Sequence, residues 1–171
     1  MQNRLSGKHV AFIAGQGVEH SHLAKPMQEL RRMGAQISVI ASSPDVLVTD
    51  TKETYKVDKA VAVADPEDYH AVVVSGGAEI ASLKPVLEFL RTFEKSGKPV
   101  GATSQGVPVL IAAELVKDRQ ATSDPRHQAL VDAAGGTWRD CEVVVDDLVI
   151  TTRHTKDLPA FSQALAKALL D

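Results

Sequence analysis

The apolar positions of the chain follow two periods in turn, one typical of buried strands and one typical of amphipathic helices. Short, nearly continuous apolar runs predict β-strands at residues 8–14, 35–42, 69–77 and 100–103. Apolar residues at helical spacing predict helices at about residues 21–33, 85–95, 107–115, 125–134 and 158–170. The run "YHAVVVSGG" at 69–77 is typical of a strand buried on both faces of a parallel sheet.

Two further segments have strand character. The segment "TYKVDKAVAVAD" at 54–65 predicts short β segments, and "CEVVVDDLVITT" at 141–152 predicts a hairpin that turns at Asp146-Asp147. Strands and helices alternate without a linker or a repeat, so we expect one α/β domain over residues 1–171, a doubly wound parallel-sheet sandwich. In such sheets, sites form at the carboxyl ends of the strands, here residues 15–19, 75–77 and 104–106.

Composition and charge narrow the classes of function. The formal net charge of the 171 residues is −3 without a basic stripe, so we expect no nucleic-acid partner. No apolar run is long enough to span a membrane. The single cysteine, Cys141, fits a reducing cytoplasm and predicts a structural thiol. Gly15-Gln16-Gly17 lacks the remainder of a phosphate-binding pattern, and we expect no cofactor.

The segment Ser104-Gln105-Gly106 joins a predicted strand to a predicted helix. A sharp, strained turn of this kind can expose a nucleophile at its apex, and Gly106 is the small residue that lets the turn close. A serine nucleophile needs a general base, which Gln105 cannot supply near neutral pH. The alternative interpretation is that Ser104 only caps the helix N-terminus.

Two other strand ends carry candidate site residues. Gly76-Gly77 either forms an oxyanion hole with its backbone N–H groups or makes a tight turn without a ligand. Glu19 is either a charge at a helix N-terminus or a site acid that faces Ser104.

The histidines do not predict a metal site. His20 and His22 stand two positions apart, and such side chains point away from each other on a helix, so we expect no metal ion there. The other histidines are scattered, which favours surface or hydrogen-bonding roles: His9, His70, His127 and His154.

Several segments together resemble the ThiJ/PfpI superfamily, in particular its PfpI-like branch. They follow the order of the family over nearly the whole chain: "KHVAFIAGQGVEHSHLAKPMQELRRMGAQISVIA", "DPEDYHAVVVSGGAE", "VLEFLRTFEKSGKPVGATSQGVPVLIAAELV", "VDAAGGTWRDCEVVVDDLVITTR" and "DLPAFSQAL". The resemblance implies a fold like that of class I glutamine amidotransferases, which is flavodoxin-like, and a small homo-oligomer. Active members carry a cysteine at the turn, a histidine directly after it, and a glutamate from the end of the first strand. Activities reported for such families include glyoxalase III or deglycase chemistry, protease activity and stress-linked chaperone behaviour.

Carried over residue by residue, the resemblance matches Glu19 to the family's glutamate and Gly76-Gly77 to its glycine pair. Ser104 stands where the cysteine is expected and Gln105 where the histidine is expected, and Cys141 does not match the nucleophile. His20 is a further candidate for the pocket. Glu79 is the candidate for a second acidic residue, across a loop shorter than that of the family.

The resemblance and the replaced residues together predict a catalytically divergent cytoplasmic protein. Its role would be stress-related or the binding of a small ligand, and its partner a second copy of itself in a homodimer or larger homo-oligomer. One alternative is an active hydrolase or glyoxalase III/deglycase-type enzyme that uses Ser104 with Glu19. Another is a chaperone-like stress protein. For the divergent site, we expect a direct hydrogen bond between Glu19 and the Ser104 hydroxyl.

Overall fold

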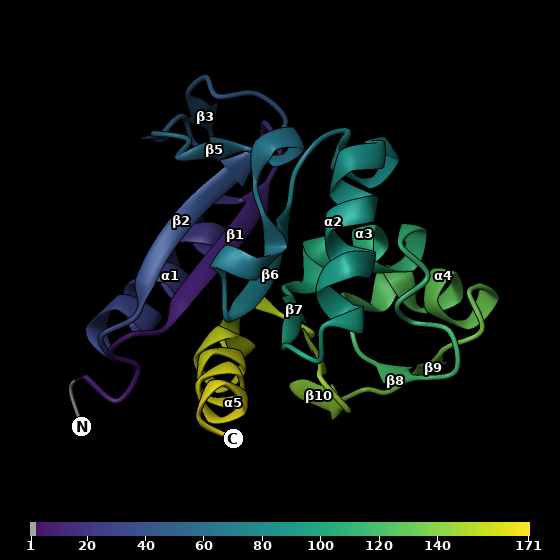
Figure 1. Ribbon diagram of the computed structural model, residues 1–171. Coiled ribbons are helices and arrows are strands. Elements are labelled where there is room, and N and C mark those ends of the chain that lie inside the picture. Colours follow the sequence, from purple (N-terminus) through teal and green to yellow (C-terminus); the bar gives the residue numbers. More distant parts are fainter. Residues whose placement is uncertain (1–2) are drawn as a thin grey trace.

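A computed structural model of the chain describes residues 3–171, and its centre is a seven-stranded sheet (Figure 1). The strand order is β10-β11-β7-β6-β1-β2-β5. The strands are β1 (His9–Ala14), β2 (Gln36–Ala41), β5 (Lys59–Ala60), β6 (Ala71–Gly76), β7 (Val100–Ala102), β10 (Val143–Asp146) and β11 (Val149–Thr152). All neighbouring pairs are parallel except β10 and β11, which form the predicted antiparallel hairpin at one edge.

Helices cover both faces of this sheet, which confirms the predicted doubly wound α/β class. One face packs against α1 (His20–Arg32) and α5 (Leu158–Leu170), and the other against α2 (Lys84–Lys95) and α3 (Val107–Ala112). Another short helix, α4 (Gln128–Ala133), lies beside α3. Among residues 3–171, no helix combines the length and the apolar character that a membrane crossing requires.

The strand pattern of the sequence explains the two-sided core. Along β1, Ala11 and Ile13 contact the α2 side, whereas Val10 and Phe12 contact the α1 side. This alternation follows from the period of two along a strand. All six residues of β6 are buried, as predicted for a central strand covered on both faces. Each large apolar side chain buried in this way stabilises the fold by about 1.5–3 kcal/mol.

Several predicted elements differ from those in the structure. The segment at 54–65 supplies two short strands, β4 (Thr54–Tyr55) and β5, but Val61–Val63 is a turn of 3-10 helix. The helix expected at 107–115 ends at Ala112, and the one expected at 125–134 begins as a 3-10 turn, Pro125–His127. Two small sheets were not predicted as such: β3 (Leu47–Val48) with β4, and β8 (Gln120–Ala121) with β9 (Thr137–Trp138). Pairings this short leave little periodic signal in a sequence.

Candidate functional site

The strand order places the site at the carboxyl edge of β1, β6 and β7. The chain leaves β1 toward β2 on one side of the sheet, whereas it leaves β6 toward β7 on the other. Such a reversal opens a crevice between the loops at this edge, where doubly wound folds bind their ligands. The pairing of β1 with β6 also shifts register between Ile13 and Ala14, at this same end. Irregular pairing of this kind is common beside functional sites.

The loop after β1, which carries Glu19, is held in place by the β3–β4 hairpin. The side chain of Gln16 donates to the carbonyl of Val46 over 3.0 Å and accepts from the N–H of Val48 over 2.8 Å. The N–H of Gly17 donates to the carbonyl of Val48 over 2.9 Å. Glu19 follows as the residue directly before α1, without a side-chain hydrogen bond to the helix end. The hairpin therefore fixes the backbone from which the Glu19 carboxylate projects.

The turn after β7 is tight but lacks the backbone strain that the sequence suggested. Ser104–Gly106 forms one turn of 3-10 helix that continues into α3, and Ser104 is not among the described residues with positive φ. Thr103, rather than Ser104, occupies the N-cap position, and neither side chain makes a capping hydrogen bond. Ser104 is therefore neither a strained apex with positive φ nor the N-cap residue, so both sequence interpretations are wrong on this point. The side chain nevertheless reaches the site edge.

Glycine at position 106 is required by close packing. A Cβ atom there would lie well inside van der Waals distance of the backbone carbonyl of Val74 in β6. The hydroxyl of Thr103 also donates to the carbonyl of Ser75 over 3.1 Å. The turn is thus seated directly on the end of β6, which requires a small residue at position 106 for packing rather than for closing a strained turn.

The glycine pair stands where β6 ends and packs against the start of the loop after β1. Gly76 and Gly77 have φ of 102° and 114°, a conformation that favours glycine. The carbonyl of Gly76 accepts from the N–H of Gly15 over 2.8 Å, and a Cβ on Gly77 would collide with the backbone of Gly15. This packing alone accounts for two glycines. The oxyanion-hole role stays a prediction.

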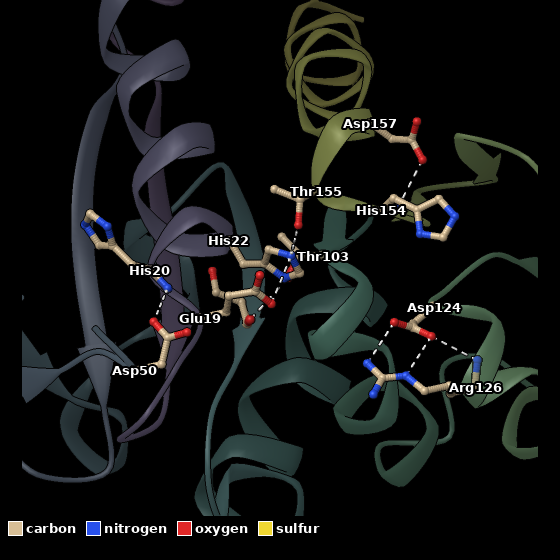
Figure 2. A network of polar contacts seen from close by, with 11 residues as sticks. Glu19, His20, His22, Asp50, Thr103, Asp124, Arg126, His154, Thr155 and Asp157 are labelled. Carbon is tan, nitrogen blue, oxygen red and sulfur yellow. Dashed lines mark hydrogen bonds and ion pairs between the residues drawn. The ribbon is translucent and has the colours of Figure 1, made fainter. Parts of the chain in front are cut away.

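The side chains at this edge enclose a pocket of about 180 Å³, called here the polar chamber. Its lining is almost entirely polar and comes from the loops after β1, β7 and β11 and from the segment before α4 (Figure 2). The lining residues are Glu19, His22, Ser104, Gln105, Asp124, Arg126, Arg153, His154 and Thr155. Three of the predicted residues, Glu19, Ser104 and Gln105, therefore do converge.

A second pocket of about 470 Å³, the wide chamber, shares Glu19 and Gln105 with the polar chamber. Gly77 lines the wide chamber, as does His127, and its other walls include apolar side chains such as Pro108 and Val109. The two chambers together form the site crevice, with Glu19 and Gln105 where they meet.

The buried histidine of the polar chamber is His22, which sequence reasoning treated only as a failed metal ligand. His22 is 1% exposed, and its Nε2 lies 3.1 Å from the Thr155 hydroxyl and 3.5 Å from a carboxylate oxygen of Glu19 (Figure 2). Its Nδ1 is buried without a hydrogen-bond partner. Burial lowers the pKa of His22, and the neighbouring Glu19 carboxylate opposes that shift. The signal that could have found His22 is its position one helical turn after Glu19.

The predicted hydrogen bond between Glu19 and Ser104 is absent from the structure. The Glu19 carboxylate contacts His22 instead, and within residues 3–171 the Ser104 hydroxyl makes no hydrogen bond although Ser104 is only 3% exposed. The reason is that Glu19 and His22 lie on the same face at the start of α1, so the carboxylate meets the ring before it meets the serine.

His20 and Glu79 line neither chamber. The His20 ring turns toward the β3–β4 hairpin, where Nε2 lies 2.8 Å from the Tyr55 hydroxyl. It thus points away from His22, as the spacing predicted (Figure 2). Glu79 stands in the loop after β6 with φ of 71° and begins a 3-10 turn. Neither residue reaches the crevice, because the backbone directs each side chain elsewhere.

Two arginines of the polar chamber already have carboxylate partners. Arg126 binds both oxygens of Asp124, over 3.1 and 2.9 Å, and this hydrogen bonding lowers the pKa of Asp124 to about 2. Arg153 contacts Asp140 over 2.9 Å and the buried Asp157 over 3.3 Å. Sequence reasoning missed both arginines, because their partners are set by loops that it could not place.

Neither a metal site nor Cys141 contributes to the crevice in the part of the chain that the structure describes. Over residues 3–171, no three His, Cys, Asp or Glu side chains gather closely enough to hold a metal ion. Cys141 is a free, half-buried thiol outside both chambers. What the crevice offers is therefore a set of hydrogen-bonding groups around Ser104, with no histidine hydrogen-bonded to that hydroxyl.

Comparisons with known proteins agree on one group of relatives. The sequence model of the DJ-1/PfpI family matches residues 8–168. "Deglycase TK1284" of Thermococcus kodakarensis is 32% identical, over 94% of this chain and 98% of its own. "Protein/nucleic acid deglycase 2" of Escherichia coli is 30% identical, over 95% of this chain and 98% of its own. A crystal structure from Anabaena variabilis, a two-domain protein with DJ-1/ThiJ/PfpI-like and ferritin-like domains, superposes with a TM-score of 0.91 at 27% identity, over 95% of this chain and 48% of that chain.

Proposed function

Because the chain belongs to the DJ-1/PfpI family, we propose that it is a catalytically divergent member whose crevice binds a small polar molecule without forming a thiol adduct. The fold is that of the family, class I glutamine amidotransferase-like and flavodoxin-like. On the resemblance described above, Ser104 and Gln105 stand where the family has its characteristic cysteine and histidine. The proposal therefore concerns what the site does.

The observation that carries the proposal is the isolation of the Ser104 hydroxyl. It has no hydrogen-bonded base, and the next residue is a glutamine. A free cysteine has a few per cent thiolate near pH 7, whereas an unassisted serine hydroxyl has essentially no alkoxide. The buried His22 is engaged with Glu19 and Thr155 rather than with Ser104. Covalent capture of a carbonyl compound at this turn therefore lacks its nucleophile.

The crevice does have the features that binding of a small molecule requires. The polar chamber is concave, lies at the carboxyl edge of the sheet, and has several side chains free to form hydrogen bonds. Its volume of about 180 Å³ suits a small compound, and the wide chamber beside it could receive a larger substituent.

The rival function is deglycase chemistry, which is favoured by the names of both curated relatives. Under that hypothesis the Ser104 hydroxyl would have to attack the substrate directly, with Glu19 or His22 as the general base. The two hypotheses differ in one measurable quantity, the consumption of a reactive carbonyl compound by the natural protein.

The first prediction is that the natural protein consumes methylglyoxal no faster than buffer does. The Cys141→Ser variant has no thiol at all and should behave in the same way. In that background, Ser104→Cys with Gln105→His puts a single thiol at the turn, next to an imidazole. We expect this variant to react with iodoacetamide and to consume methylglyoxal measurably, because a thiolate then forms in the crevice. Absorbance and a colorimetric carbonyl assay follow the reaction.

Turnover by the natural protein that survives Cys141→Ser but disappears in Ser104→Ala would establish a serine-dependent enzyme and refute the divergent function. Turnover lost only in Cys141→Ser would assign the chemistry to the other thiol and would refute it equally.

The proposal also includes self-association and a cytoplasmic location. Family resemblance supports a homodimer or a larger homo-oligomer, and the single cysteine is compatible with a reducing compartment.

A further inference from the structure

The polar chamber has one carboxylate without a cationic partner, that of Glu19. Arg126 is held by both oxygens of Asp124, and Arg153 by Asp140 and Asp157. Within residues 3–171, the Glu19 carboxylate meets neither a lysine nor an arginine at ion-pair distance, and its one ionisable contact is His22. The chamber thus contains two guanidinium groups that already pair with carboxylates, and one carboxylate with capacity for a donor.

His22 does not neutralise that carboxylate. Its burial lowers its pKa, so near pH 7 the ring is neutral and contributes an N–H rather than a charge. The charges that act on the ring are the carboxylates of Glu19, Asp50 and Asp124, opposed by Lys25. Carboxylates therefore outnumber cations among the charges that act on His22, while Arg126 and Arg153 also line the chamber. The Nδ1 of His22 has no partner in the same buried wall, and it is a further acceptor in the tautomer that carries its proton on Nε2, toward Glu19 and Thr155.

Acceptors without partners lie next to Glu19. The Ser104 hydroxyl and the Gln105 amide make no hydrogen bond within residues 3–171, and both line the polar chamber. A protonated primary amine has three N–H donors and no acceptor. The Glu19 carboxylate, the Ser104 hydroxyl and the Gln105 amide oxygen match those three donors in number and in polarity.

The size of the chamber limits what accompanies the ammonium group. Its volume of about 180 Å³ is below the roughly 300 Å³ at which sites for drug-sized ligands begin. A compound of a few non-hydrogen atoms fits, and a longer substituent has to extend past Glu19 and Gln105 into the wide chamber.

We propose that the polar chamber binds small protonated amines, with the ammonium group hydrogen-bonded to Glu19 and to the free acceptors of Ser104 and Gln105. This inference rests on the proposed binding function and names its ligand class. A carboxylate ligand is disfavoured, because Glu19 repels it and the charge of both arginines is already matched by carboxylates of the protein. A neutral carbonyl compound gains no charge-assisted hydrogen bond and leaves the Glu19 carboxylate unsatisfied.

The test is a titration of the ¹⁵N-labelled full chain, at constant ionic strength, with three probes of similar size: methylammonium chloride, sodium acetate and acetamide. We expect saturable shifts of the amide signals of Glu19, His22 and Ser104 with methylammonium alone. If acetate or acetamide saturates these signals and methylammonium does not, the ligand class is wrong, while the binding function stands. If none of the three probes saturates the signals, the inference and the binding function both fail.

Variants separate the carboxylate from the rest of the chamber. Glu19→Gln keeps the shape and removes the charge, and we expect methylammonium binding to weaken at least about tenfold, since a hydrogen bond to a charged group is lost. Glu29→Gln is the matched control, because Glu29 lies further along α1, outside the chamber, and pairs with Arg32. It should bind as the natural protein does. Equal affinity in Glu19→Gln and Glu29→Gln, with both variants folded by circular dichroism, would overturn the assignment to Glu19.

Discussion

At the scale of single residues, His22 shows how burial sets the chemistry of a side chain. The ring is closed off by α1 on one side and by the Thr155 segment on the other. Burial disfavours the imidazolium form and lowers the pKa, although Glu19, Asp50 and Asp124 pull in the opposite direction. His9, at the opposite edge of the sheet, also has a pKa lowered chiefly by burial.

These two histidines predict how stability depends on pH. Below their ordinary pKa of 6.5, the unfolded chain binds protons that the folded chain does not. The free energy of unfolding should therefore fall as pH decreases through about 6.5, by at most about 1.4 kcal/mol per pH unit for each histidine. In His22→Asn the fall between about pH 7.5 and 5.5 should be smaller, because the contribution of His22 is removed. Urea unfolding at several pH values measures the slope.

The slope is the informative quantity, because His22→Asn also alters the contact with Thr155 at every pH. Glu53 and Asp124, whose pKa values are lowered to about 2, do not affect this window. Their stabilisation is complete above their ordinary pKa values and is lost only as pH falls below about 4.5 toward 2. If the natural protein and His22→Asn have equal slopes above pH 5.5, His22 titrates in the folded state as it does in the unfolded chain.

At the scale of elements, the strand ends of β1, β6 and β7 approach one another so closely that glycine is required between them. Gly106 faces the carbonyl of Val74, and Gly77 faces the backbone of Gly15. Val74 lies within β6, and Gly15 directly follows β1 and donates to the carbonyl of Gly76. Neither backbone segment can move without breaking hydrogen bonds. The position of the Ser104 turn is therefore set by backbone contact rather than by side-chain packing.

We predict that Gly106→Ala destabilises the fold by about 3 kcal/mol or more, which is the upper end of the usual cost of overpacking. Gly106 has an ordinary φ of −86°, so the cost is steric rather than conformational. Gly97→Ala is the control, because Gly97 has φ of 76° and no atom near the added methyl group. It should cost only the roughly 1–2 kcal/mol of a left-handed residue. Thermal and urea unfolding of both variants compare the two costs, and an equal loss would show that the turn can shift away from β6.

At the scale of the whole molecule, the proposal of self-association predicts that the protein is a dimer or a larger assembly at micromolar concentration. Exposed apolar residues such as Val145 on the edge strand β10 and Leu170 near the end of α5 are available for such contacts. Size-exclusion chromatography with light scattering measures the mass, which for one chain is 18.3 kDa. A single species of that mass at all accessible concentrations would contradict the prediction.

Much of the fold could be predicted from the sequence, because it depends on local periodicity. The fully buried β6, the amphipathic α2 and the hairpin at Asp146-Asp147 each have a pattern that neighbouring residues alone specify. The prediction failed where the pattern was short: Val61–Val63 has apolar residues like a strand but forms a 3-10 turn. The site edge was also predictable, since the carboxyl ends of parallel strands meet at one edge.

The sequence by itself thus determined the α/β class, the family resemblance, and the convergence of Glu19, Ser104 and Gln105 at one crevice. Only the tertiary structure decided which groups pair within it. The Nε2 of His22 meets Thr155 across a separation of 133 residues, and Gln16 fixes its loop by binding Val48, 32 residues away. Such partners depend on where loops from distant parts of the chain come to lie, which no local period encodes. For the same reason Glu19 contacts a buried histidine instead of Ser104, and the chamber's two arginines pair with other carboxylates.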